Sequence, residues 1–232
     1  MVNNLSSIQE KADQILREIQ AACCRVNRAA DAVTLIAVSK TVGPEAVREA
    51  IKAGLMNFGE NKAQEFVSKV AAFPEAHWHF IGHLQTNKVK DIIHKAEIIH
   101  SLDRLDLAAE IQKRAGGEKV HCLLEVNVAE EISKFGLKTD DVVPFCRSLS
   151  QFPAIVVDGL MTIAPAVGTP EEIRAVFRCL RQKRDELQAL QLLNSPALWL
   201  SMGMTNDYQI AVEEGADFVR IGSGIFGKRI YL

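Results

Sequence analysis

Lys40 stands directly after an apolar strand, where its amine could reach a bound molecule. The run from Thr34 to Val38 contains no charged residue and is followed by Ser39 and Lys40. Alternation along an extended chain puts Lys40 on the same face as Ile36 and Val38. If that face is the inside of a barrel, partial desolvation lowers the pKa of the amine and makes it a nucleophile for a carbonyl carbon. A solvated loop lysine beside the strand is the alternative interpretation.

Arg220 is a charged residue inside a short apolar strand. It stands between Val219 and Ile221 in the run FVRIG, and alternation puts it on the same face as Phe218 and Gly222. An unpaired buried charge is very costly, so the guanidinium requires a partner. Two partners remain open at this point: a carboxylate from a neighbouring strand, or a ligand atom that accepts a hydrogen bond.

Two short segments after the last two expected strands combine glycine with hydroxyl side chains. They are SMGMT at 201–205 and IGSG at 221–224. In barrels of alternating strands and helices, the turns after strands seven and eight commonly bind phosphate through backbone N–H groups and a helix N-terminus. Glycine lets the backbone approach an anion closely, and Ser201, Thr205 and Ser223 add hydroxyl donors. Ordinary tight turns are the alternative interpretation.

The three features together point to one kind of small molecule. A phosphorylated aldehyde would form a Schiff base with Lys40, place its phosphate in the two glycine-containing turns, and offer a polar atom to Arg220. Each feature alone has an ordinary structural explanation. Their convergence on one end of a barrel is the stronger argument.

Other titratable residues give weaker signals. His77 and His79 share a strand face and His83 is nearby, but no acidic residue pairs with them, and we expect no metal site. The remaining histidines, including His100, have no useful spacing. Two glutamates near strand ends have a residue type suited to acid–base chemistry, although nothing in the sequence marks their pKa as shifted: they are Glu60 and Glu125.

These residues need a scaffold that brings strand ends together, and the chain shows one. Short apolar or β-branched runs alternate with helical patterns along most of the sequence. The expected strands are 33–38, 57–58, 78–81, 98–101, 121–126, 155–160, 198–201 and 218–221. The expected helices are 45–53, 63–71, 87–96, 105–115, 140–149, 171–190 and 208–214.

Eight strands alternating with helices over 232 residues predict an α/β fold, a (β/α)8 TIM barrel that forms a single domain over residues 1–232. A doubly wound open sheet is the alternative, but the turn after the first strand reads SKTVGPE and lacks the GxGxxG pattern. An extra amphipathic helix within residues 1–30 is expected to pack on the barrel. Its apolar stripe is Leu5, Ile8, Ala12, Ile15, Ile19, Ala22 and Val26.

The composition excludes several classes of protein. The formal net charge is −2, with 48% hydrophobic and 24% charged residues, which gives no electrostatic footprint for nucleic acid or an anionic membrane. No apolar run approaches the roughly 18 residues that cross a bilayer, and the N-terminus lacks a signal-peptide pattern. Five cysteines without a CxxC pair favour a reduced, cytoplasmic compartment. We expect a monomer or a weak dimer.

The residues singled out above lie in stretches that closely resemble the pyridoxal phosphate (PLP) homeostasis proteins, the YggS/PROSC-like family. Two of the stretches, SMGMTND at 201–207 and VRIGSGIFG at 219–227, are hard to produce by chance. Lys62 and His83 depart from residues that are common in the family. The other similar stretches are LIAVSKTV (35–42), FGENKAQEF (58–66), WHFIGHLQTNK (78–88), SLDR (101–104), EVNVAEEISKFGL (125–137) and GLMTI (159–163).

The resemblance implies a barrel similar to the N-terminal domain of alanine racemase, of the fold-type III kind, with PLP as the cofactor. It implies a Schiff base between PLP and Lys40, with Arg220 facing the pyridine nitrogen. It also implies that phosphate contacts come from Ser201, Thr205, Gly222 and Ser223, and that Asn61 and His79 line the pocket.

We expect a carrier that stores PLP and delivers it to apo-enzymes, without robust catalysis and with no catalytic residue. An arginine at the pyridine nitrogen disfavours its protonation and makes the cofactor a weaker electron sink. A small PLP-dependent amino-acid racemase is the alternative, but neither Tyr208 nor Tyr231 is an obvious second base. A PLP-free barrel enzyme, acting through a lysine Schiff base or on a phosphosugar, is a further alternative.

Overall fold

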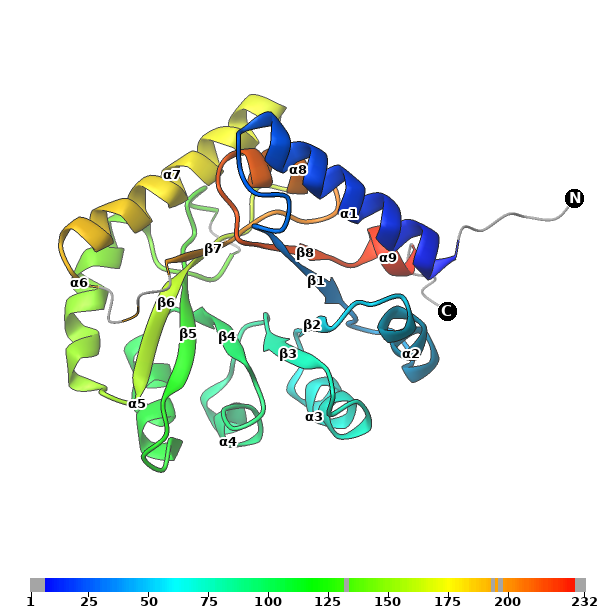
Figure 1. Cartoon of the computed structure of the whole chain (residues 1–232). Helices are drawn as coiled ribbons and strands as arrows, with labels where there is room; N and C mark the ends of the chain where they lie inside the picture. The colour runs from blue at the N-terminus through cyan, green and yellow to red at the C-terminus, as the bar shows by residue number, and fades with distance from the viewer. Residues whose placement is uncertain (1–6, 132–133, 193–194, 196–197, 228–232) are drawn as a thin grey trace, which may run out of the picture.

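Eight parallel strands close into a barrel in which each strand pairs with the next along the chain and the last pairs with the first (Figure 1). The structure, a computed structural model, describes residues 7–131, 134–192, 195 and 198–227. The expected (β/α)8 barrel is confirmed. The strands are β1 (Thr34–Val38), β2 (Asn57–Glu60), β3 (His77–Phe80), β4 (Ile98–Leu102), β5 (Val120–Glu125), β6 (Ile155–Met161), β7 (Trp199–Ser201) and β8 (Phe218–Ile221).

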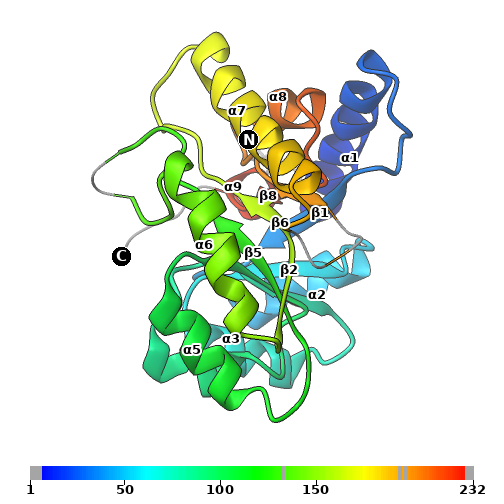
Figure 2. The same cartoon turned by 90° about the vertical axis from the view of Figure 1, so that its left-hand side faces the viewer.

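Helices cover the outside of the barrel, and most begin and end within a few residues of the predicted bounds (Figures 1 and 2). The helix predicted at 87–96 is shorter: a 3₁₀ turn, η1 (Thr86–Lys88), leads into α4 (Val89–Ile92). The sequence pattern does not predict α9 (Ser223–Phe226), which follows β8 directly. The other helical elements are α1 (Ile8–Arg25), α2 (Pro44–Lys52), α3 (Ala63–Ala72), α5 (Leu105–Arg114), η2 (Thr139–Asp141), α6 (Val142–Ser148), η3 (Leu149–Gln151), α7 (Pro170–Ala189) and α8 (Tyr208–Glu213).

The strands bury apolar side chains on both faces. One set packs under the helices in a large core that includes Ala37, Phe58 and Leu200. A smaller cluster fills the inside of the barrel, and burying side chains of this size stabilises the fold by about 1.5–3 kcal/mol each. Burial on both faces explains why the strands read as continuous apolar runs. The inner cluster is Ile36, Ile98, Leu123, Met161 and Phe218.

Alternation from the inner cluster places the predicted site residues. Phe218 belongs to the cluster, so Arg220, two positions along β8, faces the inside of the barrel. On the neighbouring strand Ile36 pairs with Arg220, and the same face continues toward Lys40 just beyond β1. The two charged residues therefore lie near the closure of the barrel, where β1 meets β8.

The first helix packs against the barrel beside α8 and α9, as expected (Figures 1 and 2). Ser7 caps it: the Glu10 backbone N–H donates to Ser7 Oγ at 3.1 Å, and the Ser7 N–H donates to the Glu10 carboxylate at 2.8 Å. Val26 at its end does not join the buried stripe, because it caps the helix and is 36% exposed. Leu5 lies outside the described residues. The stripe buries Ala12, Ile15, Ile19 and Ala22.

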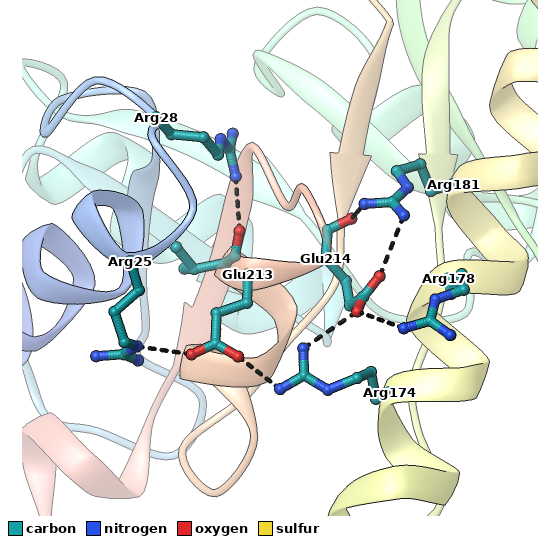
Figure 3. A network of polar contacts seen from close by, with 8 residues as sticks. Arg25, Arg28, Arg174, Arg178, Arg181, Glu213 and Glu214 are labelled. Carbon is teal, nitrogen blue, oxygen red and sulfur yellow. Dashed lines mark hydrogen bonds and ion pairs between the residues drawn. The ribbon is translucent and has the colours of Figure 1, made fainter.

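A cluster of arginines and glutamates ties α7 and α1 to α8 (Figure 3). Glu214, at the end of α8, is buried and accepts from Arg174 at 3.1 Å and from Arg178 at 3.2 Å. Glu213 pairs with Arg25 of α1 at 2.8 Å and with Arg174 at 2.5 Å. Burial alone would raise the pKa of Glu214, but the arginines outweigh burial and lower it. The helix that follows the SMGMT turn is therefore fixed from both sides.

Candidate functional site

Five polar side chains form one hydrogen-bonded row across the inside of the barrel, and we call them the polar row. They come from five different strands: Asn57 (β2), His79 (β3), His100 (β4), Ser201 (β7) and Arg220 (β8). Asn57 Oδ1 lies 3.3 Å from His79 Nε2, and His79 Nδ1 lies 3.1 Å from His100 Nε2. His100 Nδ1 lies 2.9 Å from Ser201 Oγ, and Arg220 Nη1 donates to that hydroxyl at 2.6 Å. The row connects opposite sides of the barrel.

Arg220 is 4% exposed, and the oxygens it contacts are neutral. Besides the bond to Ser201, its Nη2 donates to the Thr162 carbonyl oxygen at 2.8 Å. Burial lowers the pKa of Arg220 to about 10, and the carboxyl groups of Glu125 and Asp207 counteract part of this effect. Among the described residues no carboxylate lies within ion-pair distance of the guanidinium. The protein therefore offers the guanidinium neutral oxygens as partners; a ligand atom as a further partner stays a prediction.

Burial disfavours the charged form of both histidines of the polar row. Burial lowers the pKa of His79 to about 3, and burial also holds the pKa of His100 well below its ordinary value. The Phe218 ring packs edge-on or tilted against both imidazoles, with centroids 5.7 Å and 5.8 Å away. Each ring is therefore held in a fixed orientation inside the barrel.

Lys40 is half-buried in a turn whose flanking residues are hydrogen-bonded to side chains of α3. The Ser39 carbonyl oxygen accepts from Lys69 Nζ at 2.6 Å, and the Thr41 N–H donates to Glu65 Oε2 at 2.7 Å. Thr41 has a φ of 63°, a left-handed conformation that is costly for a β-branched residue. The hydrogen bonds on either side of Lys40 hold this conformation, and they fix where its backbone leaves β1.

The turns after β7 and β8 meet through hydroxyl groups. Thr205 Oγ1 lies 3.2 Å from Ser223 Oγ and accepts from the Gly224 N–H at 3.3 Å. Gly222, just before Ser223, passes close to the end of β1: a Cβ there would lie 3.2 Å from the Val38 carbonyl oxygen. This close approach brings the hydroxyl pair next to the turn that carries Lys40.

Asn61 directly follows β2, and its side-chain oxygen is buried. Its Oδ1 is buried and has no hydrogen-bond partner among the described residues. Gly82 packs directly on it, since a Cβ at Gly82 would lie only 2.3 Å from the Asn61 carbonyl oxygen. An unpartnered buried polar atom costs free energy, which is acceptable where a ligand completes the hydrogen bond.

Comparison with known proteins assigns the family. The alanine racemase N-terminal domain family matches residues 15–229. The pyridoxal phosphate homeostasis protein of Aquifex aeolicus is 45% identical over 226 residues, which cover 96% of this chain and 98% of that protein. The protein of the same name from Pseudomonas aeruginosa is 38% identical over 231 residues and covers 98% of both chains. The chain belongs to the pyridoxal phosphate homeostasis protein family.

Solved structures agree with this family assignment. PipY of Synechococcus elongatus, solved with PLP bound, superposes with a TM-score of 0.78 at 34% identity and covers 90% of this chain and all of PipY (100%). Alanine racemase of Streptomyces lavendulae has a TM-score of 0.68 at 16% identity, which is a likeness of fold; the match covers 94% of this chain and 57% of the racemase. The predicted likeness to the alanine racemase barrel is confirmed.

In this PLP homeostasis family member, the predicted site residues fall into two groups. One group, which includes Lys40, borders the ends of the strands. The other group, Arg220, His79 and Ser201, belongs to the polar row inside the barrel. Ser201 is fully buried, and its hydroxyl contacts Arg220 and His100 rather than the hydroxyl pair. Its assignment to the phosphate stays a prediction. Besides Lys40, the predicted site residues at the strand ends are Asn61, Thr205, Gly222 and Ser223.

Three groups in this candidate site are not among the residues predicted from the sequence: Asn57, His100 and the carbonyl of Thr162. A signal for His100 was present, because it is a polar residue within the apolar run IIHSL. Like Arg220, a polar residue at this position needs a hydrogen-bond partner once it is buried. Asn57 and the Thr162 carbonyl had no comparable signal, since only the closed barrel brings them into reach.

The structure shifts the pKa values of the two glutamates that the sequence left unmarked. Glu125, at the end of β5, is 8% exposed, and burial raises its pKa to about 7. The like charge of Asp103 adds to the increase, and Arg220 acts against it. Burial also raises the pKa of Glu60, even though Lys69 pairs with it.

The side chains of His77 and His79 lie in different surroundings. The His77 side chain is 56% exposed, 3.6 Å from the Glu97 carboxylate, whereas His79 is buried in the polar row. Within the described ranges, no three residues of the His, Cys, Asp and Glu types form a group that could hold a metal ion. No described helix is both long and apolar enough to cross a membrane.

Proposed function

We propose that this protein binds PLP, stores it, and delivers it to apo-enzymes as part of intracellular PLP homeostasis. One observation carries the proposal: the buried Arg220 guanidinium is held by neutral oxygens at the same barrel closure that Lys40 borders. This arrangement suits a ligand that offers an aldehyde to the amine and a hydrogen-bond acceptor to the guanidinium. The names of the relatives and the PLP-bound PipY structure support the same ligand.

Each part of PLP has a suitable partner among the residues at the strand ends. Lys40 provides the primary amine for covalent attachment at the aldehyde carbon. Thr205 and Ser223 provide hydroxyl donors for the phosphate, and Gly222 lets the backbone approach an anion. Asn61 and His79 line the pocket in this proposal. When bound, PLP supplies a carbonyl carbon that bonds to amines and a ring that can accept electrons.

The charge of Arg220 favours storage of the cofactor over turnover. With a pKa of about 10, its guanidinium stays protonated at neutral pH. A fixed cation disfavours protonation of a ring nitrogen beside it, and an unprotonated ring is a weak electron sink. A carrier with this site would influence amino-acid and keto-acid pools indirectly, through the supply of cofactor to other enzymes.

Tyr208 gives no support to the racemase alternative. Its hydroxyl donates to the Glu18 carboxylate on α1, and the residue is 7% exposed. Burial together with Glu18 raises the pKa of Tyr208 to about 12. A second base would have to face the substrate with a pKa closer to neutral, which Tyr208 does not do. Tyr231 lies outside the described residues.

The visible absorption spectrum of the protein incubated with PLP tests the proposal. The unchanged protein should gain an absorption band that borohydride abolishes, and mass spectrometry should find the reduced adduct on Lys40. Lys40→Ala should lack the band. Lys62→Ala is the matched control, because the Lys62 side chain is 66% exposed and pairs only loosely, at 3.8 Å, with Glu65.

A protein that stays colourless after incubation would contradict PLP binding and favour the PLP-free barrel enzyme. Delivery is tested separately by mixing loaded protein with a PLP-dependent apo-enzyme and a phosphatase that destroys free PLP. Activation that survives the phosphatase supports direct transfer, and complete loss of activation rejects it.

Sedimentation of the same sample tests the proposed monomer or weak dimer, and cell fractionation tests the cytoplasmic location.

A further inference from the structure

The polar row has a direction that its two ends impose. A guanidinium only donates hydrogen bonds, so the Ser201 oxygen must accept from Arg220 Nη1, 2.6 Å away. At the other end the Asn57 amide oxygen, 3.3 Å from His79 Nε2, only accepts. The row therefore starts at a donor and finishes at an acceptor, and the protons between them must be arranged to suit both.

With both imidazoles neutral, a single arrangement of protons satisfies every contact in the row. His79 carries its proton on Nε2 and donates to Asn57, which leaves its Nδ1 as an acceptor for His100 Nε2–H at 3.1 Å. His100 Nδ1 then accepts the Ser201 hydroxyl proton at 2.9 Å. Because that proton points at His100, a lone pair of the Ser201 oxygen faces Arg220. Both imidazoles are neutral in this arrangement.

The surroundings favour the neutral arrangement. His100 is fully buried, and burial together with the nearby Arg220 cation disfavours protonation of His100. The Phe218 ring packs against both imidazoles and prevents them from turning away. A second bond, from Arg220 Nη2 to the Thr162 carbonyl, is directed at a fixed backbone atom. The Ser201 hydroxyl is thus the adjustable one of the two contacts that hold the guanidinium.

We propose that His100 is a positioning residue: by accepting the Ser201 hydroxyl proton, it turns the Ser201 oxygen toward Arg220 and fixes the direction in which the guanidinium meets the ligand. This inference rests on the proposed function, which supplies PLP as the ligand. It assigns His100 an indirect role in PLP binding, through Ser201 and Arg220. His79 and Asn57 complete the same arrangement by fixing the proton on His100 Nε2.

The first measurement uses the unchanged protein without PLP. Nitrogen-15 NMR of the histidine side chains distinguishes a ring protonated on Nε2 from one protonated on Nδ1. We expect His79 and His100 to carry their protons on Nε2 and to remain neutral from pH 8 to pH 5. A proton on Nδ1 of His100 would overturn the inference whether or not PLP binds.

The second measurement compares PLP binding and its absorption spectrum in three variants. His100→Leu removes the acceptor of the Ser201 proton. We expect the affinity for PLP to fall by about tenfold or more and the absorption maximum to shift. His100→Asn offers an amide oxygen in place of Nδ1 and should recover affinity to within about threefold. His94→Leu is the matched control, because that histidine lies on the surface with a side chain 44% exposed, and we expect no change in affinity or spectrum.

A double-mutant cycle separates positioning from loss of packing. If His100 acts through Ser201, then adding His100→Leu to Ser201→Ala should cost little further affinity, whereas independent effects would multiply. Full additivity, or a His100→Leu variant with unchanged affinity and spectrum, would reject the inference. If the unchanged protein binds no PLP, the proposed function fails, and the NMR result alone decides the proton arrangement.

Discussion

Lys69 Nζ lies 2.5 Å from Glu60 Oε1 and 2.6 Å from the Ser39 carbonyl oxygen, so a buried ion pair supports the residue immediately before Lys40. The Lys69 side chain is 10% exposed and that of Glu60 is fully buried. The Ser39 hydroxyl donates to the same carboxylate oxygen at 2.7 Å. The pair therefore links α3, β2 and the end of β1, and it makes the position of Lys40 depend on the packing of α3.

Replacing Lys69 by methionine should be strongly destabilising. Lys69→Met keeps most of the side-chain volume but leaves the Glu60 charge buried without its counter-ion, a change that typically costs about 3–5 kcal/mol. The cost should be larger at pH 8 than at pH 5, because the pKa of Glu60 is already raised and rises further without Lys69. Urea unfolding measures it. Lys62→Met, in an exposed pair at 3.8 Å, is the control and should cost less than about 0.5 kcal/mol; equal losses in the two variants would contradict the argument.

Acid should destabilise the protein through His79. Its pKa is about 3 in the folded protein against 6.5 for the free side chain, so its contribution to stability is present above pH 6.5 and is lost as the pH falls. At pH 5 the loss amounts to about 2 kcal/mol. We therefore expect His79→Asn to show a smaller drop in unfolding free energy between pH 7.5 and pH 5 than the unchanged protein. His94→Gln, on the surface, should keep the full drop, and the idea fails if both variants behave alike.

Ionisation of Glu125 should destabilise the protein as the pH rises, whereas protonation of His79 destabilises it as the pH falls. Its pKa is about 7 in the fold, above the 4.5 of the free carboxyl, so its contribution is complete below pH 4.5 and is lost as the pH rises through 7. The full loss is about 3 kcal/mol. Glu125→Gln should flatten the decrease in unfolding free energy between pH 5 and pH 8. Glu97→Gln, with a side chain 58% exposed, should leave that decrease unchanged; the same slope in unchanged protein and Glu125→Gln would count against a buried titrating carboxyl.

Gly203 should not tolerate a side chain. Its φ is +94°, and a Cβ there would lie 2.5 Å from Ala211 Cβ and 3.0 Å from Tyr208 Cα, both on α8. Gly54 has a similar φ of +84°, but a Cβ on Gly54 would have no atom within 4 Å. Gly54→Ala therefore reports the backbone strain alone, about 1–2 kcal/mol. Gly203→Ala should cost at least about 2 kcal/mol more and should weaken PLP binding by displacing α8; thermal unfolding and PLP titration measure the two effects, and similar losses at both glycines would refute the clash.

The sequence by itself determined the barrel and the strand ends that carry the candidate site. Alternation of apolar runs and helical patterns is a local property, so the strands at 34–38 and 218–221 and their shared inner face follow from residue order alone. Lys40, Arg220 and the two glycine-containing turns were identified on the same grounds. The short helix α9 was not, because four residues carry no periodicity that a pattern can reveal.

Only the tertiary structure decided which polar groups meet. His100 and Ser201 are 101 residues apart in the chain, and closure of the barrel brings them to 2.9 Å. Closure also places the Ser201 hydroxyl inside the polar row, and it gives Arg220 neutral partners where the sequence left a carboxylate possible. Burial depends on what the whole chain encloses, so the shifted pKa values of His79 and Glu125 follow from the folded barrel and from nothing local in the sequence.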